Sequence, residues 1–217
     1  MDVALGDGEA ALSGSMWRAG FVVLYSAANA AAIAIAGAAV CGLQLQWYVA
    51  LVVLGLAMAT LQTLVIFFSG LRVSALRWWP LTFVGTAGVF PLSFTVVYFA
   101  SVILIDVVAS LGIRGAAADV AAAVAFMLPA AVAAVFVAGL QFFAFRSPPD
   151  NLLIVWFGAN ALAGFVGAPA IENVALGCAR VGIGPEWVES PVGWLAAGAL
   201  GGVLTGLVLS RLRATTG

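Results

Sequence analysis

Long apolar stretches alternate with short polar connections along the whole chain. A helix needs about 20 apolar residues to cross roughly 30 Å of hydrocarbon, and six stretches reach that length. The pattern predicts an all-α fold, a polytopic transmembrane bundle of about six helices. The stretches are Ala19–Leu43, Trp47–Phe68, a third that begins between Val73 and Trp79 and ends near Ile105, Val120–Phe145, Leu152–Ile171 and Val192–Leu209.

Two prolines modify this picture, and the domain organisation is simple. The third stretch is long enough to be tilted or kinked at Pro91, and Pro129 predicts a bend in the fourth. Residues 1–217 are treated as one transmembrane domain, with a polar N-terminal segment at 1–18 and a closing helix at 192–210. The longest connection, residues 172–191, contains a fairly apolar part that lies at the interface, dips inward or forms a covered loop.

Composition supports a lipid environment. Hydrophobic residues make up 65% of the chain and charged residues 8%, against about 25% charged in an ordinary soluble domain. The charges gather between the apolar stretches, where a membrane protein meets water. The sequence therefore predicts an integral membrane protein whose first partner is the lipid bilayer.

The arginines are distributed unevenly between the two sides that six spans define. One side carries Arg18, Arg72, Arg77, Arg146, Arg211 and Arg213, and the other carries Arg114 and Arg180. Cytoplasmic loops are enriched in basic residues. We therefore expect a bacterial inner-membrane protein with both termini in the cytoplasm.

Several kinds of chemistry lack the residues that they need. The chain has no His, and all eight cationic side chains are Arg, which removes imidazole ligands and lysine nucleophiles. No predicted span carries a central Asp or Glu. Cys41 and Cys178 either pack as small apolar residues or form a disulfide. We expect no enzyme activity, no cofactor, no metal site and no nucleic-acid partner.

A similarity at a spacing of about 79 residues predicts an internal repeat. Ala59-Thr60-Leu61-Gln62 aligns with Ala138-Gly139-Leu140-Gln141, and each Gln is followed by paired Phe, an Arg, a Trp and a Gly-x-x-Gly motif. The expected units, about 47–105 and 120–171, are helical hairpins in the same orientation. The pattern, with Leu71-Arg72, Trp78-Trp79 and Trp156, resembles that of uncharacterised small polytopic bacterial membrane proteins. This resemblance implies no established activity.

Polar residues inside the predicted spans are the candidate site residues. Gln62, Gln141, Asn29 and Asn160 are amides in a hydrocarbon environment, so each needs a hydrogen-bond partner. One interpretation is structural, with bonds between helices. The alternative is that they line a polar cavity or bind a head group. Thr82 and Thr86 are further possible partners.

Two other groups of residues have a position that suggests a role. Arg77, Trp78, Trp79 and Arg146 lie at the predicted membrane boundary and are expected to be interfacial anchors; if Arg77 is instead partly buried, it is expected to bond Gln62. Gly198, Gly202 and Gly206 form a stripe of small residues that favours close helix packing, within the bundle or with another subunit.

Two functional hypotheses follow. The first is a non-enzymatic accessory or structural subunit of a larger membrane complex, with other membrane subunits or a second copy as partners. The second is a small transporter or channel for a neutral or lipid-like solute, with Gln62 and Gln141 lining the path.

Overall fold

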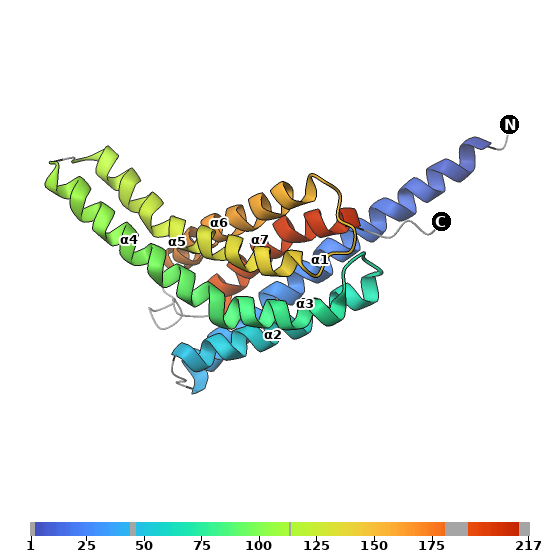
Figure 1. The fold of residues 1–217 in the computed structure, drawn as a ribbon, viewed down its shortest axis with the longest axis horizontal. Helices are drawn as coiled ribbons and strands as arrows, with labels where there is room; N and C mark the ends of the chain where they lie inside the picture. Colours follow the sequence, from blue (N-terminus) through green and yellow to red (C-terminus); the bar gives the residue numbers. More distant parts are fainter. Residues whose placement is uncertain (1–2, 44–46, 113, 181–190, 213–217) are drawn as a thin grey trace.

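The protein is seen in a computed structural model that describes residues 3–43, 47–112, 114–180 and 191–212. In this part of the chain every regular element is a helix, so the predicted all-α fold is confirmed (Figure 1). The elements are α1 (Val3–Leu43), α2 (Trp47–Ser69), α3 (Ala75–Val84), a π-helical turn η1 (Gly85–Val89), α4 (Phe90–Ser110), α5 (Ala116–Phe142), α6 (Leu152–Arg180), α7 (Pro191–Leu209) and a final 3-10 turn η3 (Ser210–Leu212).

Five helical segments of the described chain are long and apolar enough to cross a membrane. They are Gly14–Ala36, Leu51–Ser69, Ala75–Ser110, Ala123–Phe142 and Leu195–Leu212. The remaining expected span, Leu152–Ile171, falls in α6, which has 29 residues and a described apolar stretch at Leu152–Gly167. The helices are compatible with a multi-pass integral membrane protein.

Two expected boundaries need correction. Helix α1 begins at Val3, so the polar segment 1–18 is helical from that residue onward. Helix α6 continues to Arg180, so residues 172–180 are helical although we expected a loop there. The remainder of the expected loop, 181–190, lies outside the described residues. Helix α6 runs on although Pro169 lies two residues before the expected end, and α1 includes the pairs Asp7-Gly8 and Ser13-Gly14.

The bundle closes on itself. Each long helix packs against its neighbour in the sequence, and α7 returns to pack extensively against α1, which makes a ring of helices. The largest fully buried side chains include Trp78, Trp156 and Tyr25. An aromatic and aliphatic core built around them fills the ring at the end where α2 leads into α3 and α5 leads into α6.

The third span is one continuous helical segment that contains a π-helical turn just before Pro91. Pro91 lacks an N–H, and in the turn before it the Phe90 N–H bonds the Gly85 carbonyl, five residues back. The ribbon bends between α3 and α4 at this turn (Figure 1). The kink that we expected at Pro91 is therefore built from the π-helical turn Gly85–Val89.

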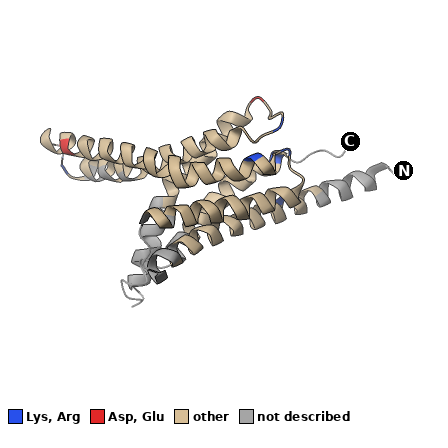
Figure 2. Ribbon diagram, turned by 60° about the horizontal axis from the view of Figure 1, so that its bottom comes forward, with Lys and Arg blue, Asp and Glu red and all other residues tan. Residues whose placement is uncertain are grey.

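Apart from Arg18, which lies within the long helix α1, the described charges lie near helix ends or in the connections between helices (Figure 2). The Arg72 N–H bonds the Leu212 carbonyl at 2.9 Å, and the Arg146 N–H bonds the Arg72 carbonyl at 2.9 Å. These backbone bonds bring Arg72, Arg146 and Arg211 to the same end of the bundle. Arg114 lies in the turn between α4 and α5, at the opposite end.

Candidate functional site: the buried polar network

Gln62 is the centre of a buried hydrogen-bond network that joins three helices. It lies on α2 and is 4% exposed. Its Nε2 donates to Asn29 Oδ1 on α1 at 2.8 Å, and its Oε1 accepts from Trp78 Nε1 on α3 at 3.1 Å. Asn29 in turn donates from Nδ2 to the Tyr25 carbonyl at 2.7 Å. Nε2 also lies 3.8 Å from Met58 Sδ on α2, so both polar atoms of the Gln62 amide have neutral partners within the chain.

Through Tyr25 the network also reaches helix α7. The Tyr25 side chain is 1% exposed, and its hydroxyl interacts with the side chains of Asn29 and Thr205. Thr205 lies on α7 and also donates to the Gly201 carbonyl at 2.7 Å. The polar contacts therefore link α1, α2, α3 and α7 within the hydrocarbon-length part of the bundle.

Gln141 makes a second, smaller polar contact. Its Nε2 donates to Thr82 Oγ1 at 3.0 Å, which joins α5 to α3, and both side chains are buried. Asn160 takes part in neither group, because its Nδ2 donates to the Trp156 carbonyl on its own helix at 2.9 Å. The four predicted amides thus separate into one bonded pair, one amide with a threonine partner and one that is locally satisfied.

Trp78 lies in a different place from the one that we expected. It is 0% exposed, and its ring meets Trp156 with ring centroids 6.0 Å apart in an edge-on arrangement. An interfacial anchor presents its ring to the head groups, whereas this indole is the hydrogen-bond donor to Gln62. The bond that we considered for Arg77 is made by Trp78 instead.

The neighbouring residues keep to the surface. Arg77 and Arg146 are exposed. Trp79 is partly exposed, its Nε1 donates to Thr60 Oγ1 at 3.3 Å, and its ring stacks on Phe83 at 5.6 Å. Their positions are compatible with anchoring at a membrane boundary.

Two buried residues were not among the predicted site residues: Tyr25, which belongs to the network, and Trp156, whose ring meets that of Trp78. The Trp156 indole donates to the Ala138 carbonyl at 3.0 Å, so it ties α6 to α5. Its place after Gln141, 15 residues on, parallels the 16 residues from Gln62 to Trp78. That spacing was the available signal for Trp156, whereas Tyr25 carried none beyond its position within a span.

The two connections that follow the Gln-bearing helices lie side by side. Val73 and Phe145 form an antiparallel bridge, and the Ser74 N–H bonds the Ala144 carbonyl at 2.8 Å. The two indoles nevertheless use different acceptors, a side chain for Trp78 and a backbone carbonyl for Trp156. The internal duplication stays a prediction.

The glycine stripe of α7 packs against α1 of the same chain. A Cβ placed on Gly202 would lie 2.5 Å from Ser26 Cα, and one on Gly198 would lie 2.8 Å from Ala30 Cα. Gly206 is looser, with Tyr25 Cδ1 at 3.4 Å. Ser26 Oγ crosses the contact to donate to the Ala199 carbonyl at 2.7 Å. The stripe thus forms a seam within the bundle, the first of the two uses that we considered.

The described residues offer no cluster of candidate metal ligands. They contain no group of three or more His, Cys, Asp or Glu side chains that could hold a metal ion. The network is made of neutral amides, hydroxyls and indoles whose donors and acceptors bond one another. Its chemistry is that of a structural lock between helices.

Comparison of the chain with models of known protein families, with curated proteins and with solved structures found no match.

Proposed function

We propose that this chain is a non-enzymatic subunit of a larger membrane assembly, in which a rigid ring of helices presents the α4–α5 hairpin to a neighbouring membrane protein. The observation that carries the proposal is a contrast: the polar side chains of the interior bond one another, whereas the apolar α4 side of the hairpin has little protein packed against it. The proposal places no chemistry on the chain itself.

The hairpin is the least covered part of the bundle. This holds for its α4 side: the 36-residue segment Ala75–Ser110 has 6% of its most apolar window buried, compared with 22% for Leu51–Ser69, 29% for Ala123–Phe142 in α5 and 44% for Leu195–Leu212. Helix α4 packs against α5 and makes no extensive contact with another long helix of the described chain. The two helices project away from the rest of the bundle in Figure 1.

Helix length adds to this argument. At 1.5 Å per residue, the 36 residues span about 54 Å, while the hydrocarbon core is about 30 Å thick. The outer part of α4 also carries large apolar side chains with no cover, such as Phe99 at 62% and Ile103 at 64% exposed. A neighbouring transmembrane helix packed on this face would make dispersion contacts that fit the shape of these side chains. Fluid lipid also makes dispersion contacts, but its chains do not keep one fixed shape.

The closed interior favours a structural role over a catalytic one. Gln62, Asn29, Gln141 and Trp78 bond one another or Thr82. In the described residues, Thr63 Oγ1 is the one buried side-chain oxygen or nitrogen that has no partner. The polar side chains of the interior therefore take part mainly in hydrogen bonds that join one helix to another.

Gentle extraction from native membranes followed by mass determination tests the proposal. We expect the chain to purify together with another membrane protein. A Phe99→Ala, Ile103→Ala variant should lose that protein and keep its own thermal stability. A Leu56→Ala, Leu64→Ala variant, altered at exposed apolar positions of α2 and outside the hairpin, should keep the partner. Purification of the wild-type chain alone, or only with copies of itself, would contradict the proposal.

A transport role is the second candidate, and one observation favours it. Amides and hydroxyls from α1, α2, α3, α5 and α7 face the inside of the same ring. If they line a path for a neutral solute, purified protein in liposomes should give a solute flux that Gln62→Leu abolishes. Flux that Gln62→Leu leaves unchanged would exclude a path through this network.

A further inference from the structure

Both helices of the α4–α5 hairpin contain a proline, and the two prolines lie at nearly the same level. Helix α5 runs antiparallel to the segment from α3 to α4 (Figure 1). A Cβ placed on Gly85 would lie 3.0 Å from Val137 Cγ1, so these two residues are level with each other. Pro91 follows Gly85 by six residues, and Pro129 precedes Val137 by eight. The two prolines therefore lie within about one helical turn of each other along the hairpin.

The backbone around Pro91 departs from the regular pattern of helical hydrogen bonds. The π-helical turn Gly85–Val89 precedes Pro91, and Pro91 itself has no N–H to donate. Side-chain hydroxyls bond carbonyls at this place: Ser93 Oγ donates to the Val89 carbonyl at 2.6 Å, and Thr95 Oγ1 donates to the Pro91 carbonyl at 2.7 Å. Prolines, π-helical turns and hydroxyl bonds of this kind are the features at which helices bend.

Pro129 weakens α5 at the matching level. It lies inside α5, so the Ala125 carbonyl lacks the donor that residue i+4 provides in a regular helix. The ribbon of α5 changes direction along its length in Figure 1. A single weak place in one helix would be braced by the intact helix beside it. Two weak places at one level allow both helices to bend together.

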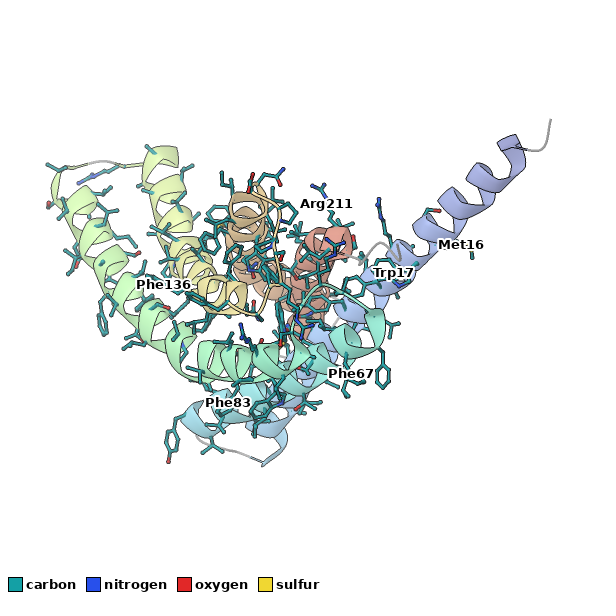
Figure 3. The ribbon with its side chains drawn as sticks, turned by 45° about the vertical axis from the view of Figure 1, so that its right-hand side comes forward. Met16, Trp17, Phe67, Phe83, Phe136 and Arg211 are labelled. Atoms are coloured by element: carbon teal, nitrogen blue, oxygen red, sulfur yellow. The ribbon has the colours of Figure 1, made fainter. Side chains whose placement is uncertain are left out.

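Close helix contacts hold the hairpin on the bundle side of this level. A Cβ on Gly55 of α2 would lie 2.9 Å from Ala87 Cβ, and a Cβ on Gly164 of α6 would lie 2.9 Å from Ala131 Cα. Ala87 precedes Pro91, and Ala131 follows Pro129, so both contacts lie between the prolines and the rest of the bundle. Figure 3 shows Phe83 on α3 beside α2 and the hairpin running away from that contact. Helices that approach so closely cannot slide past each other without overlap.

Beyond the two prolines, the hairpin is held mainly by its own two helices. Within the described chain, α4 has extensive contacts with α5 and with the adjoining turn η1 only. Leu92 and Val96, the first large apolar side chains of α4 after Pro91 that are highly exposed, have 70% and 63% of their surface uncovered. Residues 92–128, called the arm below, are thus a helix pair joined to the bundle at one level.

We infer that the arm pivots on a hinge at the level of Pro91 and Pro129, so that its tilt relative to the bundle changes while α4 and α5 stay paired. Hinges of this kind place the change of backbone angles in a few residues between two rigid parts. Val107 lies 16 residues beyond Pro91, about 24 Å along the helix, so a pivot of about 10° moves it by about 4 Å. The hinge lets the apolar face of α4 align with a neighbouring surface of a different tilt. The motion belongs to this chain alone and does not require the partner proposed above.

Distance distributions between pairs of spin labels, measured by pulsed electron paramagnetic resonance in phosphatidylcholine nanodiscs, test the hinge. Labels are attached to introduced cysteines in a Cys41→Ala, Cys178→Ala background. The pair Val52→Cys and Val107→Cys crosses the hinge, and the pair Val52→Cys and Leu76→Cys lies within the bundle. All three labelled positions are exposed. The distribution of the pair that crosses the hinge should be broader by about 4 Å, the displacement that a pivot of about 10° produces.

A Pro91→Ala, Pro129→Ala variant gives both helices back a backbone donor and should remove at least about half of this extra width. Pro80→Ala is the matched control, because Pro80 lies inside α3 on the bundle side of the hinge. It should leave both distributions unchanged.

A wild-type distribution across the hinge that is no broader than the one within the bundle would overturn the inference, and this outcome does not depend on how any proline variant folds. Unchanged width in the double variant, or equal narrowing by Pro80→Ala, would overturn it as well. All of these measurements use the chain alone, so their outcome is separate from whether another membrane protein purifies with it.

Discussion

Replacement of Gly202 by Ala tests how closely α7 and α1 must approach. The added Cβ would lie 2.5 Å from Ser26 Cα, 3.2 Å from Asn29 Cβ and 3.2 Å from Ser26 N. Two of these three atoms belong to the backbone of α1, so no side-chain rotation relieves the overlap. Non-bonded carbon atoms sit about 3.5–4.0 Å apart, so α7 has to move by about 1 Å.

The cost of this movement has two parts. Overpacking a tight contact typically costs about 1–3 kcal/mol. Displacement of α7 also weakens the 2.7 Å bond from Ser26 Oγ to the Ala199 carbonyl, and bonds between transmembrane helices average about 0.6 kcal/mol. We therefore expect a loss of about 2–4 kcal/mol, which lowers the Tm by about 6–12 °C for a chain of this size.

Gly201→Ala is the matched control. It lies next to Gly202 on α7, and its Cβ would meet Ala163 Cβ at 3.7 Å, an ordinary contact. Both variants gain the same helix propensity, up to about 1 kcal/mol, so the difference between their Tm values isolates the overlap with α1. Thermal unfolding in one detergent, followed by tryptophan fluorescence, measures it. Equal Tm values for the two variants would refute the close approach of α7 and α1.

Three further predictions concern other parts of the bundle and use the same unfolding assay. Gln62→Leu leaves the Trp78 indole N–H without an acceptor and should lower the free energy of unfolding by about 1–3 kcal/mol. The double variant with Trp78→Phe should lose less than the sum of the two single losses. Strict additivity of the two losses would contradict the bond between these side chains. Gly70→Ala places a Cβ on a residue whose φ is 63° and should lower the free energy of unfolding by about 1–2 kcal/mol. Gly88→Ala is its control: no atom lies within 4 Å of the added Cβ, so stability should hardly change. Arg77→Leu should change stability by less than about 0.5 kcal/mol because the side chain is exposed; a large loss would show that the guanidinium is buried.

The helices and most of their ends could be predicted because hydrocarbon imposes a single local rule. The expected span Trp47–Phe68 became α2, Trp47–Ser69, and the expected Val192–Leu209 became α7, Pro191–Leu209. Backbone groups without water must bond within the helix, so length and apolarity alone indicate where a span lies. The same rule says little where a helix leaves the hydrocarbon, which is why the ends of α1 and α6 were placed wrongly.

The candidate site was predicted only in part. The need of Gln62 for a partner follows from burial, and Asn29 was among the possible partners. The position of Trp78 did not follow, because a Trp next to an Arg at the end of a span is typical of a residue at the interface. Its burial goes with the backbone pairing of residues 73–74 with residues 144–145, about 70 positions later in the sequence, which places Trp78 against Trp156.

The sequence by itself determined the solvent of this protein, the number and approximate extent of its helices, and the absence of imidazole and lysine chemistry, because these depend on residue type and local length. Only the tertiary structure decided that the glycine stripe faces α1, that Trp78 bonds Gln62, and that Thr63 Oγ1 has no hydrogen-bond partner among the described residues. Lipid surrounds every transmembrane helix with an equally apolar medium, so hydropathy carries no information about which face meets which neighbour. That choice is made by shape and by the few hydrogen bonds that helices from distant parts of the chain form together.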